Sequence, residues 1–127
     1  MKPGKDFALE VYFSKWEFTA RYNIGGSDIE SLTLSALMEY ADDEDRQQWE
    51  NLYLGYTETY GSPGLREVIG NTYQDIAAED ILCFAGAEEA IYCAMHAILG
   101  QEDHALVCYP NYQSAESIPL SICETDG

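Results

Sequence analysis

The chain has 127 residues, with 6 basic and 23 acidic side chains and a formal net charge of −17. This charge opposes binding to nucleic acids and to anionic membrane surfaces, because the long-range electrostatic term has the wrong sign for both. Hydrophobic residues make up 46% of the sequence, enough for one core, and no apolar run reaches the roughly 20 residues of a membrane-spanning helix. The composition therefore predicts one soluble domain, or part of one, without nucleic-acid or membrane partners.

The N-terminal ten residues are charged and contain no apolar segment of signal-peptide length, so we expect a cytoplasmic protein. The four cysteines include no C-x-x-C pair and have mostly apolar neighbours, which favours reduced thiols in the core over disulfides or metal ligands. Neither histidine has the spacing of a zinc motif, and no metal site is predicted. The residues in question are Cys83, Cys93, Cys108, Cys123, His96 and His104.

The first thirty residues predict an extended arm. Apolar side chains alternate from Phe7 to Phe13 without helical spacing, which is typical of a partly buried extended segment. The arm is followed by residues 23–28, in which Gly25 and Gly26 tolerate positive φ. We therefore expect a turn there.

Two short helices and a loop are predicted next. Ser31 or Thr33 can cap a first helix, because a hydroxyl at that position accepts a hydrogen bond from an amide of the first turn. Acidic residues suit the first turn of a second helix, since the helix dipole favours negative charge there. The predicted segments are a helix over Leu34–Tyr40, a helix from the acidic cluster Asp42–Asp45 through Leu52, and a loop over Tyr53–Tyr60.

The second half of the chain predicts a strand-helix-strand unit and hence an α/β fold. Ser62 followed by Pro63 is typical of a helix start. Short continuous apolar runs indicate strands buried on both faces, and the order strand, helix, strand predicts a right-handed parallel unit. The predicted segments are a helix from Pro63 with an apolar face from Leu65 to Ile76, a strand over Ile81–Ala85, a helix over Ala87–Leu99 with its cap at Gly100, a strand over Ala105–Tyr109 ended by Pro110, and a third strand over Ile118–Cys123.

The turn at Gly86, between the first of these strands and its helix, is the most informative local feature. Free amide groups at a helix start bind anions such as phosphate, and Gly86 and Ala87 are small enough for a phosphate to approach the backbone. Many such turns use glycine only for close packing. The fingerprints of nucleotide-binding loops are not met, so both interpretations stay open.

Three motifs follow one another in the second half of the chain. They are Tyr56-x4-Gly61-x3-Leu65-Arg66-x2-Ile69, then Ile81 before Gly86-Ala87-x-Glu89-Ala90, then Asp103 before a segment ending in Pro110-x-Tyr112. Together they resemble the N-terminal part of the fold-type I pyridoxal-phosphate-dependent aminotransferases of class I/II, over residues 55–114 and more loosely over 20–54. The resemblance implies an incomplete α/β aminotransferase fold, with an N-terminal arm and small-domain-like helices in residues 1–54 and the start of the cofactor-binding large domain in residues 55–127.

The resemblance also implies how the cofactor pyridoxal 5′-phosphate (PLP) would be bound. Backbone amides would hold its phosphate, and one aromatic side chain would stack on its pyridine ring. A second tyrosine would reach the cofactor phosphate of a neighbouring subunit, which implies a homodimer or a higher oligomer. The implied contacts are Gly86, Ala87 and Glu88 to the phosphate, Tyr112 to the ring, Tyr56 to the neighbouring subunit, and Gly25 near the substrate carboxylate.

The catalytic group of the family is missing from these motifs. The lysine that forms the Schiff base in the family lies downstream of the Pro-x-Tyr element, whereas the lysines of this chain are Lys2, Lys5 and Lys15. We therefore predict no catalytic residue. Arg66 fits a helix-surface or pairing residue better than a substrate clamp.

Our leading hypothesis is the N-terminal segment of a PLP-dependent aminotransferase, an enzyme that transfers an amino group between an amino acid and a 2-oxo acid; the segment alone would be inactive. The alternative is a non-catalytic truncated domain that acts as a binding or oligomerisation module, and a third hypothesis is a small nucleotide-binding domain. In the family fold, the strands that match 81–85 and 105–109 are not sheet neighbours, which leaves open strand edges. We expect rearranged pairing or oligomerisation to cover them.

Overall fold

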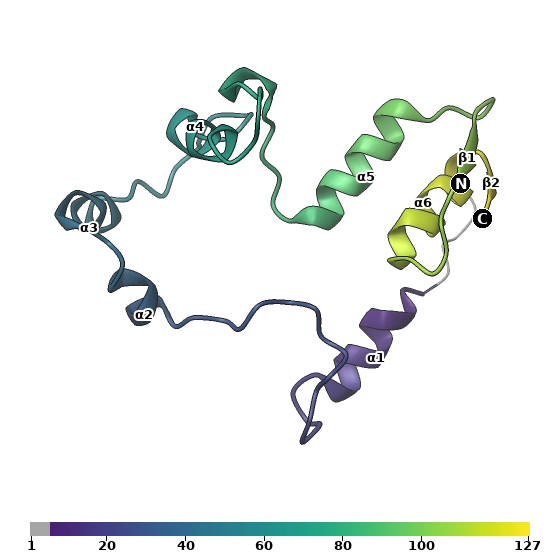
Figure 1. Ribbon diagram of the computed structural model, residues 1–127, viewed down its shortest axis with the longest axis horizontal. Helices are drawn as coiled ribbons and strands as arrows, with labels where there is room; N and C mark the ends of the chain where they lie inside the picture. The colour runs from purple at the N-terminus through teal and green to yellow at the C-terminus, as the bar shows by residue number, and fades with distance from the viewer. Residues whose placement is uncertain (1–5) are drawn as a thin grey trace.

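The computed structural model describes residues 6–127 as a mainly helical chain with one small parallel sheet. The elements follow one another around an open ring, so that the start of the chain returns to the helix near its end (Figure 1). In chain order they are α1 (Ala8–Trp16), α2 (Leu34–Met38), α3 (Asp43–Glu50), α4 (Pro63–Gly70), a short 3₁₀ turn (Ala78–Asp80), α5 (Ala87–Ile98), β1 (His104–Leu106), α6 (Gln113–Ile122) and β2 (Glu124–Asp126).

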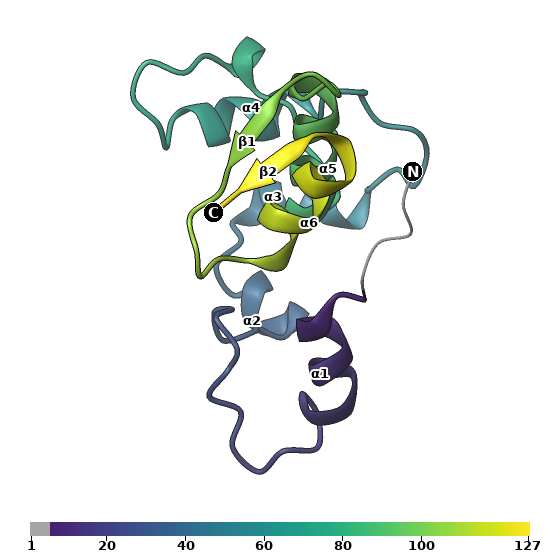
Figure 2. The same ribbon diagram turned by 90° about the vertical axis from the view of Figure 1, so that its right-hand side faces the viewer.

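The sheet consists of β1 and β2, which pair in parallel and lie side by side in Figure 2. Ala105 lies opposite Thr125, and the pairing continues beyond β1 because the Val107 N–H donates to the Asp126 carbonyl at 2.8 Å. The connection between the two strands is α6. The chain therefore has a parallel strand-helix-strand unit, but it begins one strand later in the sequence than predicted.

The predicted strand over residues 81–85 is not formed. Ile81 has extended backbone angles, but the segment pairs with another part of the chain through one backbone bond, from Cys83 N–H to the Tyr60 carbonyl at 2.9 Å. Its side chains are half-buried or exposed, so the expectation of burial on both faces is also wrong. A strand requires a neighbouring strand for its amides and carbonyls, and no such strand lies beside this segment among residues 6–127.

The predicted extended arm is also wrong, because residues 8–16 form the helix α1. The alternation that suggested a strand was incomplete, since Ala8 and Tyr12, at the intervening positions, are not strongly polar. Glu10 in the first turn and Lys15 in the last turn complement the helix dipole. These signals favoured a helix over an unpaired extended segment.

The predicted third strand over residues 118–123 is replaced by α6 and the short β2 that follows it. Ser114, Ile118 and Pro119 are buried on one side of α6, with the spacing of a helix face. Pro119 lies inside the helix, where a proline removes one backbone hydrogen bond. Burial of this face outweighs that loss.

The starts of α2, α3 and α4 were predicted correctly because they depend on local side-chain hydrogen bonds. Thr33 Oγ1 accepts an amide of the first turn of α2 at 3.2 Å, and Ser62 Oγ does the same for α4 at 3.4 Å. In α3, Asp42 and Asp45 each accept the other's backbone N–H, at 2.9 and 3.2 Å. Residues 53–60 form no regular element, as expected of the predicted loop.

The C-terminal end of α5 differs from the prediction, which placed the last residue at Leu99 and the cap at Gly100. The helix ends at Ile98, and Leu99 follows it in extended conformation. Gly100 lacks the positive φ of a glycine cap, and its N–H donates to the Asp103 carboxylate at 2.6 Å. The Asp103 side chain thus fixes the turn that leads to β1.

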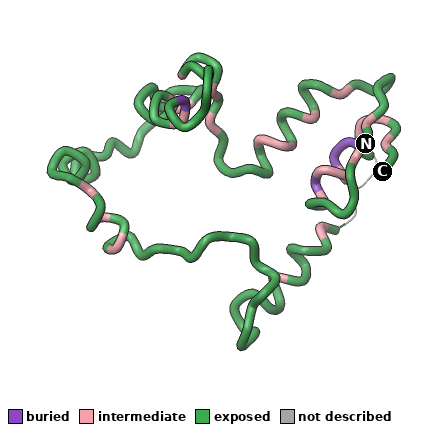
Figure 3. The backbone as a smooth tube through the Cα atoms, in the orientation of Figure 1, coloured by how far each residue is buried: buried purple, intermediate pink, exposed green. Residues whose placement is uncertain are grey.

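Little of this chain is buried. Gly70, Ser114, Ile118 and Pro119 are the buried residues among 6–127, and Figure 3 shows exposed backbone around nearly the whole ring. The total accessible surface is 11281 Å², whereas a compact monomer of this mass exposes about 6,800 Å². The composition would suffice for one core, but the apolar faces of separate helices do not close on one another to form it.

The four cysteines are unpaired thiols in the structure. Their predicted place in a core is wrong, because Cys93 and Cys108 are exposed and Cys83 and Cys123 are half-buried. No helix of residues 6–127 is long and apolar enough to cross a membrane.

Candidate functional site

The start of α5 has a backbone conformation that only glycine adopts readily. Gly86 is its N-cap residue, with φ 112° and ψ 158°. A Cβ added to Gly86 would meet no atom within 4 Å, so the space above this turn is open. The first amides of a helix have no acceptor within it, and no side chain caps this start. Residues 86–88 are exposed, and the backbone N–H groups of Gly86, Ala87 and Glu88 have no hydrogen-bond acceptor within residues 6–127.

Two glutamates lie in the first turn of α5, but the chain's own donors hold their carboxylates. The Ala85 N–H donates to Glu89 Oε2 at 2.7 Å, and the Ser114 hydroxyl donates to Glu88 Oε2 at 2.9 Å. A free carboxylate here would compete with an anionic ligand for the helix amides. Glu89 is thus bound to the amide just before Gly86 and Glu88 to α6, and neither carboxylate accepts a hydrogen bond from the amides of residues 86–88.

Tyr112 lies immediately before α6, of which it is the N-cap residue. Its ring centroid is 5.1 Å from that of Phe7, with an interplanar angle of 57°. Its side chain is 43% exposed, which leaves part of the ring free for another flat group. The peptide bond before Pro110, two residues earlier, is cis.

The hydrogen bond between Ser114 and Glu88 joins the two parts of the site. Ser114 is 1% exposed and lies two residues after Tyr112, whereas Glu88 is in the first turn of α5. The bond therefore fastens the segment of the aromatic ring to the helix start that presents the amides. The structure thus brings together four of the predicted cofactor-binding residues, namely Gly86, Ala87, Glu88 and Tyr112.

Tyr56 and Gly25 lie away from this junction. Tyr56 is fully exposed. It belongs to the segment between α3 and α4, and this segment lies on the opposite side of the ring from α6 (Figure 1). Gly25 lies in the exposed segment between α1 and α2, where its N–H donates to Asn23 Oδ1 at 3.2 Å. That bond agrees with the predicted turn. Within residues 6–127, neither residue contributes to the α5–α6 junction.

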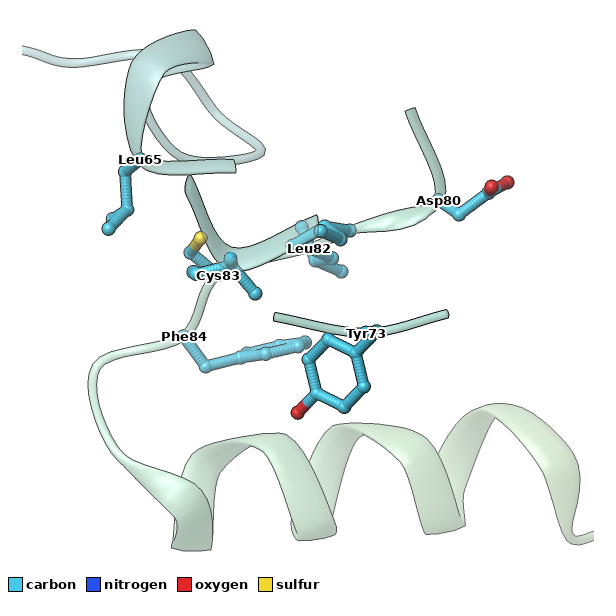
Figure 4. Close-up of a pocket in the computed structure, with 8 residues that line it drawn as sticks. Leu65, Tyr73, Asp80, Leu82, Cys83 and Phe84 are labelled. Atoms are coloured by element: carbon cyan, nitrogen blue, oxygen red, sulfur yellow. The ribbon is translucent and has the colours of Figure 1, made fainter. Parts of the chain in front are cut away.

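A shallow pocket of about 480 Å³ lies elsewhere, between α4 and residues 80–84. Figure 4 shows the Phe84 and Tyr73 rings together at one side of it, while the Asp80 carboxylate points away. Its other lining residues are mostly aliphatic, such as Leu65 from α4, but they include Cys83. No charged group is aimed into this pocket, and none of its lining residues belongs to the α5–α6 junction.

No group of three metal-ligating side chains occurs within the described part of the chain. Lys15 lies in the last turn of α1, with its Nζ 4.7 Å from the centre of the Trp16 ring. Lys2 and Lys5 lie outside the described residues. The junction therefore presents amides and an aromatic ring, which fit a phosphorylated aromatic ring compound, but no described lysine faces it.

Two features of the site were missed in the sequence. One is the buried Ser114–Glu88 hydrogen bond, and the other is the contact of Phe7 with Tyr112. Both join residues far apart in the chain. The only signal in the sequence was the small polar residue Ser114 near an otherwise apolar helix face, which is too common to identify a partner.

The pKa of Tyr112 is raised above its ordinary value of 10.0, first by burial and then by the negative charges of Glu88 and Glu10. We expect Glu88→Gln to lower this pKa toward 10.0, because the amide keeps an acceptor for Ser114 but removes the charge. An alkaline titration that follows tyrosinate absorbance, with Tyr112→Phe as the reference spectrum, measures it. The distant Glu67→Gln on α4 is the control; an equal shift in both variants would contradict a local effect.

The raised pKa also fixes the sign of a stability change. The unfolded chain would release the Tyr112 proton at lower pH than the folded chain, so ionisation favours unfolding. The stabilisation is complete below about pH 10 and is lost as the pH rises through the higher folded-state pKa. Because Glu88→Gln should lower the folded-state pKa of Tyr112, it should reduce the difference between the folded and unfolded pKa values and so the stability that depends on it.

Comparison with known proteins gives a structural match. No family model matches the chain, and no curated protein matches it. A PLP-dependent aminotransferase from Streptococcus suis 89-1591 superposes on 99% of the chain with a TM-score of 0.87 and 31% sequence identity. The chain spans 34% of the length of that aminotransferase chain. The resemblance inferred from the motifs is thereby confirmed, as is the partial aminotransferase fold.

Proposed function

Because the chain has the fold of part of a PLP-dependent aminotransferase, we propose that its α5–α6 junction supplies the phosphate-binding and ring-stacking part of a PLP site. The observation that carries this proposal is the Ser114–Glu88 hydrogen bond, which joins the segment of Tyr112 to the open helix start at Gly86. An anion site and a flat aromatic surface at one junction match the two chemical parts of this cofactor.

The residues of the junction would have separate roles. The amides of Gly86, Ala87 and Glu88 would donate to the phosphate oxygens, with the positive end of the α5 dipole behind them. The Tyr112 ring would fix the plane of the cofactor ring by stacking. When bound, PLP supplies the electron sink through which an amino group can pass from an amino acid to a 2-oxo acid.

The proposal assigns binding and orientation to these residues, but not the transfer itself. Transfer requires a lysine of lowered pKa beside the cofactor, whereas Lys15 lies on α1 over Trp16. The partners of the PLP site would be an amino acid, a 2-oxo acid and a second copy of the chain. Full exposure of Tyr56 supports the last of these, because its hydroxyl is free to reach a site on another copy.

Titration of the chain with PLP tests this function. We expect PLP to bind saturably and inorganic phosphate to compete with it. Pyridoxal, which lacks the phosphate group, should bind only weakly. Borohydride treatment should trap no lysine adduct specific to the site, and addition of amino acids should leave the spectrum unchanged. If pyridoxal bound as tightly as PLP, the proposed binding of the phosphate by the amides of Gly86, Ala87 and Glu88 would be contradicted.

A non-catalytic oligomerisation module is the second candidate, favoured by the large accessible surface. The chain exposes 11281 Å², roughly 4,500 Å² more than a compact monomer of its mass. Exposed aromatic side chains such as Tyr56 and Phe18 are part of this surface. Light scattering together with the PLP titration separates the two functions: assembly without PLP binding favours the module, whereas a monodisperse monomer at high concentration excludes it.

A further inference from the structure

A single side chain holds the N-terminal helix against the rest of the ring. The Oε1 atom of Gln113 accepts the Ala8 N–H at 2.8 Å, and its Nε2 atom donates to the Asp6 carbonyl at 3.0 Å. Within the described residues, these are the hydrogen bonds that connect residues 6–20 to the chain beyond them. They close the open ring where α1 meets the start of α6 (Figure 1).

The bond to Ala8 also caps α1. The N-cap residue of this helix is Phe7, whose side chain cannot accept a hydrogen bond, so one of the free amides of the first turn is satisfied from outside the helix. The helix has nine residues, and isolated helices shorter than about 12–15 residues are marginal in water. The order of α1 therefore depends on Gln113.

Docking of α1 brings two of its groups to Tyr112, the residue before Gln113. The Phe7 ring contacts the Tyr112 ring at a centroid separation of 5.1 Å. Glu10, in the first turn of α1, adds its negative charge to that of Glu88 from α5 in raising the pKa of Tyr112. The orientation of the Tyr112 ring is thus set from two sides, by α1 through Gln113 and by α5 through the Ser114–Glu88 bond.

We propose that Gln113 is a positioning residue, which seats α1 on Tyr112 and thereby holds the ring in place to receive the cofactor. The inference rests on the proposed function, because it gives α1 a role in a site that Tyr112 helps to form. If Gln113 has this role, the docking of α1 and the binding of the cofactor each favour the other. A ligand that binds the seated ring more tightly must stabilise docked α1 by the same free energy.

Amide hydrogen exchange of the full chain tests the two hydrogen bonds by which Gln113 holds α1, which we call the clasp. In Gln113→Leu, which keeps the size of the side chain but removes both hydrogen-bonding groups, we expect exchange across residues 8–16 to become at least about tenfold faster. Gln113→Glu should give an intermediate rate, since its carboxylate accepts the Ala8 N–H but cannot donate to the Asp6 carbonyl. The matched control is Gln48→Leu on α3, where a glutamine donates at 3.3 Å to Glu44 on its own helix.

PLP affinity of the same variants tests the positioning role. We expect Gln113→Leu to bind PLP several-fold more weakly, Gln113→Glu to recover part of the loss, and Gln48→Leu to match the parent chain. Faster exchange in α1 with unchanged PLP affinity would overturn the positioning role, and unchanged exchange in Gln113→Leu would overturn the clasp. If the parent chain binds no PLP, the proposed function fails and the positioning role with it, while exchange in α1 still reports on the clasp.

Discussion

Substitution of Gly86 by alanine should abolish most of the binding of PLP. The backbone of Gly86, at φ 112° and ψ 158°, lies in a region that is essentially restricted to glycine. Holding another residue there costs about 1–3 kcal/mol, so the turn would relax toward negative φ and redirect the first amides of α5. If the phosphate binds those amides, that cost predicts an affinity about 10- to 100-fold lower, measured by PLP titration.

The control is a second glycine that also has open space around it. A Cβ on Gly64, in the first turn of α4, would meet no atom within 4 Å, and its φ is not in the positive region. Gly64→Ala should therefore stabilise α4 by about 0.5–1 kcal/mol and leave PLP affinity unchanged. Because neither alanine meets a neighbouring atom, any difference between the variants comes from backbone conformation. Equal affinities in the two variants would exclude Gly86 from the phosphate site.

The parts of the fold that the sequence predicts well are those whose causes are local. Caps such as Thr33 and Ser62 bind amides three residues later, so the same few residues that carry the signal also form the bond. The helix Ala87–Ile98 has acidic residues in its first turn and glycine before it, and its start was predicted to the residue. Local hydrogen bonds need no knowledge of the rest of the chain.

The parts that failed depend on distant residues. Whether residues 81–85 become a paired strand depends on a neighbouring strand, and whether residues 8–16 become a helix depends partly on Gln113, more than one hundred residues away. Apolar content alone could not decide either case. The open ring also explains why burial was overestimated, since apolar helix faces count toward a core only if other elements cover them.

In the candidate site too, local features could be predicted from the sequence and contacts between distant residues could not. Gly86 could be proposed because glycine directly before a helix is a local pattern, even though the strand predicted before it does not form, and the motif order then added Tyr112. The bond that joins them, from Ser114 to Glu88, could not be found in this way. Glutamate in the first turn of a helix is explained by the helix dipole alone, so its second contact, to α6, leaves no trace in the sequence pattern.

The other large effect is expected at Arg66, which fastens α4 to the 3₁₀ turn ahead of the site. Its Nε donates to the Gly61 carbonyl at 3.1 Å and its Nη1 to the Ala78 carbonyl at 2.8 Å, as a pairing residue would. Arg66→Met keeps the aliphatic length but removes both of these hydrogen bonds, and only the Ala78 carbonyl keeps another partner, the Ile81 N–H at 3.3 Å. We expect a loss of about 2–3 kcal/mol from the local stability of residues 62–83, because hydrogen bonds from a charged donor are worth more than neutral ones.

Amide exchange across residues 62–83 measures this loss, and two further variants identify its cause. Arg66→Lys keeps the charge but offers a single point donor for two carbonyls, so its effect should be intermediate. In Arg46→Met, the side chain removed binds only the nearby Ala41 carbonyl on an exposed surface, and we expect a much smaller change. If Arg66→Lys were as stable as the parent chain, charge rather than the paired hydrogen bonds would be responsible. The segment that Arg66 fixes at Ala78 continues directly into Gly86, so loosening it should also weaken PLP binding, but less than Gly86→Ala does.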